Sequence, residues 1–284
     1  MLRVAYFVLA AVFVVCGVSR ASDESLTVAT YNIRRIVDEP REYWTDRRPL
    51  MVQCIRAIAP DVMGTQEALY PQIKDLESDL PEFRWVGLGR DGGSDDEFCA
   101  VFYRVDRLEP LAFGHFWLSD YPEVMGSITW GTQFRRMCTW VRLRDRRTGR
   151  EFSVWNTHFD HQVQEAREKS AELIRDRAGR WEKDRPVIVL GDFNSRAGVN
   201  PAYEALTRDG FFTDTWDTAK AKPHLPESGT ATFNGWGEFP LGDARIDWIL
   251  TRGPWTVERV EIVTFAKDGR YPSDHFPVVA RLRL

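Results

Sequence analysis

The sequence is poor in the residues that bind soft metals or cross-link a chain. It has 4 cysteines and 5 histidines among 284 residues, and no CxxC pair. A zinc site built from thiolates is therefore not expected. If Cys16 leaves with a leader segment, Cys54, Cys99 and Cys138 remain, and an odd number is no disulfide framework. Cys99 and Cys138 could still pair across neighbouring strands.

Long apolar runs are also scarce. One occurs near the start, where Arg3 is followed by an apolar stretch from 4 to 18 and by the small residues Ser19 and Ala21. This order is typical of a secretory signal peptide. The alternative is a membrane anchor, but the stretch is shorter than the ~20 residues that a span needs. We predict a signal peptide over residues 1–21, a secreted or periplasmic protein and no stable membrane span.

The chain has no large excess of charge of either sign. Lys and Arg number 38 against 42 Asp and Glu, which gives a net charge of −4. Loss of Arg3 and Arg20 with the leader would change this to −6. Such a protein lacks the overall positive charge of a general duplex-DNA binder, although a local basic cleft is compatible with it.

Internal repeats, low-complexity blocks and linkers are absent too, so residues 22–284 read as one domain. Apolar periodicity predicts many short strands with a few helices between them. Residues 91–97 and 217–243 are rich in turn formers and predict loops. Residues 61–67 predict a short strand followed by a loop. We expect further strands over 26–33, 98–103, 108–113, 139–144, 152–157, 187–190, 246–251, 257–265 and 278–284, and helices over 47–59, 70–80, 164–183 and 203–208.

An apolar run that begins at Val187 ends in Gly191-Asp192-Phe193-Asn194. Residues two apart in an extended segment point the same way, so the side-chain oxygens of Asp192 and Asn194 should emerge together. Gly191 allows a close backbone approach. Such oxygens coordinate hard cations or orient water. The alternative is a simple turn, since Gly, Asp and Asn are turn formers.

A second polar segment precedes the last expected strand. Asp274 and His275 are adjacent there, and Asp247 interrupts another apolar run. A buried carboxylate needs a partner, so a His275–Asp247 pair would satisfy Asp247 and hold the imidazole in one tautomer. Asp274 would then be free for a metal ion or water. Taken alone, the segment could equally be an exposed Asp and a capped His at a strand start.

Two histidines and a carboxylate lie close together in His158, Asp160 and His161. If the segment stays extended, His158 and Asp160 share a face. The clustering favours a functional role over a structural one. A transition metal held by all three is disfavoured, because ligands so close in sequence fit one ion poorly.

The remaining candidates are ordinary when taken alone. Asn32 ends the first expected strand, and Glu67 follows another apolar strand in a Gln-Glu pair. Arg34, Arg135 and Arg136 are cations that could hold phosphate oxygens. Their usual alternative is a solvated surface position.

The order of these segments is more informative than any one of them: a strand-end Asn, Gln-Glu, Thr-His, Gly-Asp-Phe-Asn, Ile-Asp and Ser-Asp-His. In that order they resemble the endonuclease/exonuclease/phosphatase superfamily, which includes deoxyribonuclease I, inositol polyphosphate 5-phosphatases, bacterial sphingomyelinases and deadenylase catalytic domains. The resemblance runs from about Leu26 to Leu284. Residues 116–119, 122–123 and 156–161 also resemble a subgroup of secreted bacterial members. Gly-Asp-Phe-Asn and Ser-Asp-His-x-Pro are specific for the superfamily, not for a substrate.

The resemblance implies an α/β fold, a four-layer α/β sandwich in which two mixed β-sheets pack face to face with helices outside. It makes Glu67 the main metal ligand, with Asn32 and Asp274 near the ion, which would be Mg²⁺ or Mn²⁺. Asp192 would orient or deprotonate the attacking water, and Asn194 would hold the phosphate or that water.

Imidazoles and guanidiniums complete the implied site. His275, oriented by Asp247, would bind or protonate the phosphate, and His158 would stabilise the pentacovalent phosphorane. These residue types suit the charge that develops during in-line attack of water on phosphorus. The residues expected to bind substrate are Arg34, Arg136 and His161.

We therefore expect a secreted, monomeric, divalent-metal-dependent phosphoester hydrolase. Its substrate would be a phosphorylated small molecule, a lipid headgroup or a nucleic acid, with a nuclease acting on single strands as the main alternative. A non-catalytic binding module on the same scaffold would have lost metal-binding or water-handling residues, and every one is present. Repair members carry a tyrosine in the site, for which Tyr103 is the candidate here.

Overall fold

The computed structural model describes residues 24–40, 42–222, 229–237 and 242–284. The signal peptide expected over residues 1–21 lies outside these ranges and stays a prediction. Within the described ranges, none of the helices combines the length and the apolar character that a membrane crossing requires.

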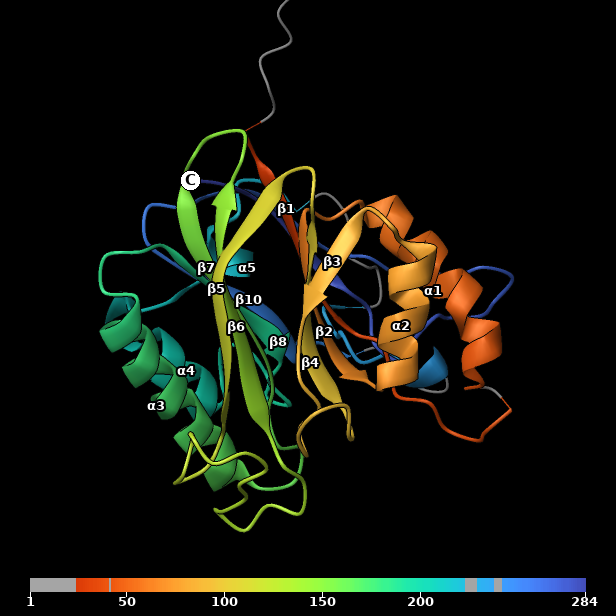
Figure 1. Ribbon diagram of the computed structural model, residues 1–284, viewed down its shortest axis with the longest axis horizontal. Coiled ribbons are helices and arrows are strands. Elements are labelled where there is room, and N and C mark those ends of the chain that lie inside the picture. The colour runs from red at the N-terminus through yellow and green to blue at the C-terminus, as the bar shows by residue number, and fades with distance from the viewer. Residues whose placement is uncertain (1–23, 41, 223–228, 238–241) are drawn as a thin grey trace, which may run out of the picture.

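Within the described residues, twelve strands form two six-stranded sheets (Figure 1). The first sheet has the order β11 (Thr256–Ile262), β12 (Val278–Arg283), β1 (Leu26–Asn32), β2 (Val62–Ala68), β4 (Phe98–Arg104) and β3 (Phe83–Val86). The second has the order β5 (Leu108–Trp117), β6 (Met137–Asp145), β7 (Glu151–His158), β8 (Val187–Asp192), β10 (Asp247–Arg252) and β9 (Thr213–Asp214). Both sheets are mixed, because β1–β2 and β7–β8 are parallel and the other pairs are antiparallel.

Helices cover the outer faces of the two sheets. In Figure 1, α1 (Trp44–Ile58) and α2 (Tyr70–Asp79) lie outside the first sheet, and α3 (Gln164–Trp181) and α4 (Pro201–Thr207) lie outside the second. The short helix α5 (Thr215–Thr218) and the 3₁₀ turns Arg208–Gly210 and Gly235–Gly237 lie in connections. The expected four-layer α/β sandwich is confirmed.

The core consists of three apolar layers that match this architecture. Leu190 and Val101 belong to the layer between the sheets, Ile55 and Leu76 to the layer under α1 and α2, and Ile174 to the layer under α3 and α4. Each is almost completely buried. Burial of one such side chain contributes about 1.5–3 kcal/mol, so the packing of the two sheets on each other and on the helices α1, α2, α3 and α4 holds the scaffold of the site in place.

The side chains of Asn156 and Gln66 join the two sheets close to the strand ends that carry the site. Asn156 of β7 donates from Nδ2 to the carbonyls of Thr65 (2.9 Å) and Ala100 (2.8 Å), and its Oδ1 accepts from Gln66 (2.7 Å). Gly64 makes this approach possible, because a Cβ there would lie 2.1 Å from a methyl of Leu190. The distance between the sheets is therefore fixed next to the strand ends that carry the site.

The local predictions differ from the structure mainly at short elements. Strands β3 and β9 were not expected, since they contain 4 and 2 residues and lack a readable apolar alternation. Strand β5 continues to Trp117 rather than ending at residue 113, because its second half stays paired with β6. Cys99 and Cys138 are free, buried thiols.

Candidate active site

Strand register brings three of the expected residues side by side in the second sheet. Parallel pairing of β7 and β8 places His158 opposite Asp192, and antiparallel pairing of β8 and β10 places Asp247 opposite Asp192. Residues directly opposite each other point to the same face of a sheet. The three side chains therefore form a row at the end of the strands.

The first sheet contributes Asn32 and Glu67 from the ends of the parallel strands β1 and β2. Asn32 Nδ2 donates to Glu67 Oε1 (2.9 Å) and to Asp192 Oδ2 (3.0 Å), while its Oδ1 accepts from the backbone of Arg34 (3.0 Å). Ser273 donates to the Asn32 carbonyl at 2.6 Å and so ties the segment before His275 to β1. Asn32 thus connects the expected metal ligand with the expected base.

Three site residues have left-handed backbone conformations that are unusual outside glycine. The φ angles are 63° at Glu67, 57° at Arg34 and 46° at Asn194. Each such residue costs on the order of 1–3 kcal/mol and persists when its surroundings impose it. Strain of this kind concentrates at functional sites, and here it turns side chains from strand ends toward one cavity.

His275 is held between two carboxylates. Its Nδ1 lies 3.0 Å from Asp247 Oδ2, and its Nε2 lies 3.8 Å from Asp192 Oδ2. Burial opposes the charge on the ring, but Asp247 and Asp192 outweigh it and raise the pKa of His275 to about 10. The pairing of His275 with Asp247 expected from the sequence is present, and it leaves a protonated imidazole facing Asp192.

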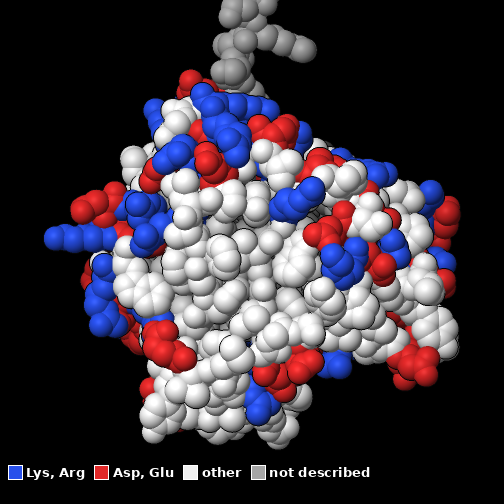
Figure 2. Space-filling view, in the orientation of Figure 1, with Lys and Arg blue, Asp and Glu red and all other residues white. Residues whose placement is uncertain are grey.

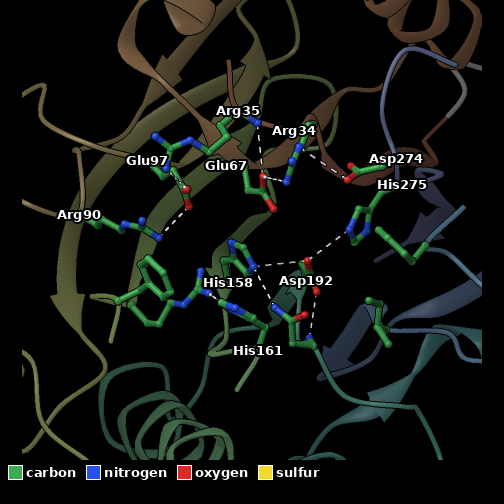
Figure 3. A pocket seen from close by; sticks show the side chains of 15 residues that line it. Arg34, Arg35, Glu67, Arg90, Glu97, His158, His161, Asp192, Asp274 and His275 are labelled. Atoms are coloured by element: carbon green, nitrogen blue, oxygen red, sulfur yellow. Dashed lines mark hydrogen bonds and ion pairs between the residues drawn. The ribbon is translucent and has the colours of Figure 1, made fainter. Parts of the chain in front are cut away.

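Asp192 and His158 are both buried beside this imidazole. Burial, together with the nearby Asp247, raises the pKa of Asp192 to about 7. Burial and the guanidinium of Arg136 lower the pKa of His158 well below its usual value. His158 Nε2 lies 3.0 Å from the Asn194 amide nitrogen, which donates to it, and 3.4 Å from Asp192. His158 is therefore a neutral imidazole, and Asp192 titrates near neutral pH. Figure 3 shows Asp192 between the two imidazoles of His158 and His275.

The donor set fits a divalent cation. Glu67, His158 and Asp192 each offer an atom within 4.8 Å of the other two. Burial works against ionisation of Glu67, but the Asn32 amide and nearby cations outweigh it and hold the pKa of Glu67 below its ordinary value. An ionised carboxylate with further oxygen donors around it is what a hard cation requires.

Arg34 lies between two of the expected metal-site carboxylates. Its guanidinium is 3.7 Å from Glu67 and 3.8 Å from Asp274, and its Nε pairs with Glu42 at 2.8 Å. Figure 3 shows it pointing into the space between them. Burial raises the pKa of Asp274. Glu67 and Asp274 thus face a shared cationic position.

Most of these groups line one cavity of about 410 Å³, whereas Asn32 and Asp247 lie behind its wall and act through their hydrogen bonds to Glu67, Asp192 and His275. Of the expected substrate-binding residues, Arg34, Arg136 and His161 all line it, and Arg136 lies 3.0 Å from His161 Nδ1. The cavity is lined by Arg34, Arg35, Glu67, Arg90, Glu97, Phe134, Arg136, His158, His161, Asp192, Asn194, Phe233, Ile246, Asp274 and His275. Four arginines therefore face four carboxylates, so the wall has no large excess of either charge.

Two expectations need correction. Tyr103 is not a site residue: it packs in the core between the sheets, because its strand position points away from the cavity. Residues 91–97 form a loop, but Glu97 at its end is 8% exposed and lines the cavity. Asp160, for which a metal-binding role was disfavoured, shapes the backbone instead: its Oδ1 accepts from the backbone N–H groups of Gln162 and Val163.

Sequence reasoning missed Arg47, which holds two site-bearing segments together. Its guanidinium donates to the carbonyls of Ile33 (2.8 Å), Pro272 (3.0 Å), Arg34, Arg35 and Glu42. Arg47 is 1% exposed. An arginine on the apolar stripe of a helix is unusual, and that position was the available sign of its role.

Comparison with known proteins agrees with this geometry. A profile described as the endonuclease/exonuclease/phosphatase family matches residues 29–275. The endonuclease/exonuclease/phosphatase of Bacteroides vulgatus is 34% identical with a TM-score of 0.86, covering 92% of this chain and 99% of that one. A mannosyl-6-phosphatase of Bacteroides thetaiotaomicron is 33% identical with a TM-score of 0.85, covering 91% and 100%.

A more distant relative is nocturnin of Drosophila melanogaster. It is 29% identical over 180 residues, and the chain spans 26% of its length. Endonucleases, exonucleases and phosphatases all hydrolyse phosphoester bonds, with a divalent metal ion in this family. The profile match covers most of the chain and includes every expected site residue. The chain therefore belongs to the endonuclease/exonuclease/phosphatase family and is a phosphoester hydrolase.

Proposed function

We propose that the protein hydrolyses a small phosphorylated molecule, with a phosphorylated sugar as the favoured substrate, and that Mg²⁺ is its metal ion. The observation that carries this proposal is the convergence of Glu67, Asp192 and His275 on one cavity of about 410 Å³. The similarity to a mannosyl-6-phosphatase over 91% of the chain supports a sugar phosphate. We also propose export, on the basis of the expected leader over residues 1–21.

Each protein group has a role in this proposal. Asp192, with a pKa of about 7, accepts a proton from the attacking water. Protonated His275, held by Asp247, contacts the phosphate oxygens and stabilises their developing charge. Asn194 lines the same cavity, with its side-chain nitrogen donating to His158 Nε2, and would hold the phosphate or the attacking water. Glu67 would hold Mg²⁺ with Asp274 and Asn32 near it, and the bound ion would polarise the phosphate.

A nuclease acting on single strands is the second candidate. The rings of Phe134 and Phe233 line the cavity and are 36% and 46% exposed, so each could stack on a base. A single-strand groove also needs a continuous basic track. On the face drawn in Figure 2, Lys and Arg alternate with Asp and Glu among the described residues, and the cavity wall is balanced in charge. These observations favour a small substrate.

A substrate panel tests the proposal. Phosphomonoesters, phosphodiesters and a single-stranded oligonucleotide are incubated with Mg²⁺, Mn²⁺ or EDTA, using wild type, Asp192→Ala and His275→Ala. We expect metal-dependent release of phosphate from a sugar phosphate, lost in both variants. Full metal-dependent turnover by both variants would contradict the mechanism, and preference for the oligonucleotide would replace the substrate assignment.

A further inference from the structure

The cavity has a second polar side that the reaction does not use. Glu97, Arg90 and Arg35 lie on the wall away from Asp274 and His275, with Glu67 between the two groups (Figure 3). Phe134 also lines the cavity, and its ring lies next to Arg90. Glu97 and Arg90 come from the loop before β4, Arg35 from the segment after β1, and Phe134 from the connection between β5 and β6. A phosphate ester seated at Asp192 and His275 would direct its alcohol portion toward this side.

The carboxylate of Glu97 is largely buried, yet it lines the cavity, and two arginines hold it in place. Arg90 donates to its Oε2 at 2.7 Å and Arg35 donates to its Oε1 at 3.1 Å. Arg90 is itself anchored by Asp96 at 2.8 Å. A carboxylate has about four acceptor positions, so each oxygen of Glu97 keeps capacity for one more donor. Hydroxyl groups are the donors that such a position accepts.

Charge on this side argues against a second phosphate. Arg35 and Arg90 are balanced by Asp96 and Glu97, which they contact directly, and Arg136 lies 3.8 Å from the carboxylate of Asp160. A nucleotide's next phosphate would have to approach the Glu97 carboxylate, which would repel it. A neutral, hydroxyl-rich group meets no such penalty.

An aromatic ring completes this side of the cavity. Phe134 is 36% exposed, and the guanidinium carbon atoms of Arg90 and Arg136 lie 5.5 and 6.0 Å from its centroid. These contacts fix the ring orientation and leave part of it open. An exposed ring beside fixed polar groups can pack on the apolar face of a sugar ring.

We propose that Glu97, oriented by Arg90 and Arg35, together with Phe134, forms a subsite for the hydroxyl-bearing leaving group of a sugar phosphate; this rests on the proposed function. Glu97 accepts hydrogen bonds from hydroxyls of the sugar, and Phe134 packs against its ring. Both are specificity-determining residues, since neither lies at the reacting phosphorus. Sites that hydrogen-bond a substrate hydroxyl reject analogues without it strongly.

The test compares two esters of primary alcohols: mannose 6-phosphate and n-hexyl phosphate, which has no hydroxyls. We expect wild type to prefer the sugar phosphate by at least about 100-fold in kcat/KM. Glu97→Gln should lower kcat/KM for mannose 6-phosphate roughly 10- to 100-fold. The kcat/KM for n-hexyl phosphate should change less than about twofold. Phe134→Leu should weaken binding of the sugar phosphate, so that KM rises for mannose 6-phosphate and not for n-hexyl phosphate.

Asp91→Asn is the matched control, because Asp91 lies in the same loop, pairs with Arg135 and does not line the cavity. It should leave both rates unchanged.

An equal loss of both rates in Glu97→Gln, with an unchanged thermal midpoint, would overturn the subsite. If wild type hydrolyses neither ester with Mg²⁺ or Mn²⁺, the proposed function fails. The subsite is then tested by calorimetry. Wild type should bind mannose 6-phosphate more tightly than n-hexyl phosphate, and Glu97→Gln should abolish this difference. Equal binding of the two esters by wild type would overturn the subsite.

Discussion

His275 Nδ1 lies 3.0 Å from Oδ2 of Asp247, a member of the row of side chains that strand register creates at the end of the second sheet. The imidazole is therefore charged and fixed, and its other nitrogen faces Asp192 at 3.8 Å. A cation and a carboxylate of near-neutral pKa share one wall of the cavity. This arrangement supports proton acceptance and charge stabilisation at the same phosphate.

The first prediction concerns pH. Activity requires ionised Asp192 and protonated His275, so kcat/KM should rise through about pH 7 and fall through about pH 10. Asp247→Asn removes the main group that raises the pKa of His275, while burial still lowers it. The alkaline limb should then move to lower pH. An alkaline limb that stays in place in a pH–rate profile of Asp247→Asn would exclude His275 as the titrating acid.

Asp192→Asn should change activity and stability in opposite directions. Loss of the general base should lower kcat by about 10²–10⁴-fold. The folded protein holds the Asp192 proton more tightly than the unfolded chain does, since the pKa is raised to about 7. Wild type therefore loses stability as pH rises from about 4 to 7. Urea unfolding at pH 8 in EDTA should show the variant at least as stable as wild type, and clear destabilisation would contradict the account.

Arg47→Lys should impair both stability and turnover. A lysine cannot reproduce five hydrogen bonds to carbonyls in three segments. Each lost bond is worth about 1 kcal/mol, so the free energy of unfolding should fall by about 2–4 kcal/mol and kcat by about tenfold or more. Arg48→Lys is the control, because Arg48 follows Arg47 on α1 but makes only partly exposed ion pairs, with Asp75 and Asp79 of α2. Equal effects of the two variants in urea unfolding and kcat would exclude a positioning role.

Gly64→Ala should destabilise the contact between the sheets. The new methyl would lie 2.1 Å from Leu190 and 2.7 Å from Asn156. Overpacking of this kind costs about 1–3 kcal/mol. Gly242→Ala, where the methyl meets open space, should leave the free energy of unfolding nearly unchanged. If calorimetry shows equal stability for both variants, the sheets are not fixed at this point.

Sequence reasoning reached the strand-end positions because apolar runs and the polar residues that end them are local patterns. The 187–194 segment is the clearest case: the run predicts β8, and Asp192 and Asn194 both reach the cavity. The partner of His275 was also predictable, because Asp247 stands in an apolar strand and a buried carboxylate needs a cation or a donor.

Other features depend on contacts between distant segments. Residues 91–97 carry turn formers, and their composition gives no sign that Glu97 folds inward to pair with Arg35. The role of Arg47 depends in part on the Pro272 carbonyl, which lies 225 positions away in the sequence. The left-handed backbone of Glu67 is imposed by its surroundings in the same way. Such features follow from tertiary structure and have no local pattern.

Anomalous diffraction from a crystal soaked in Mn²⁺ tests the central claim most directly. If residues from both sheets converge on a divalent cation, one strong peak should lie in contact with the Glu67 carboxylate, within the cavity that Asp192 and His275 line. Glu67→Gln should lose that peak. A saturating soak that yields no peak in this cavity, or a peak bound only by residues elsewhere, would contradict the account.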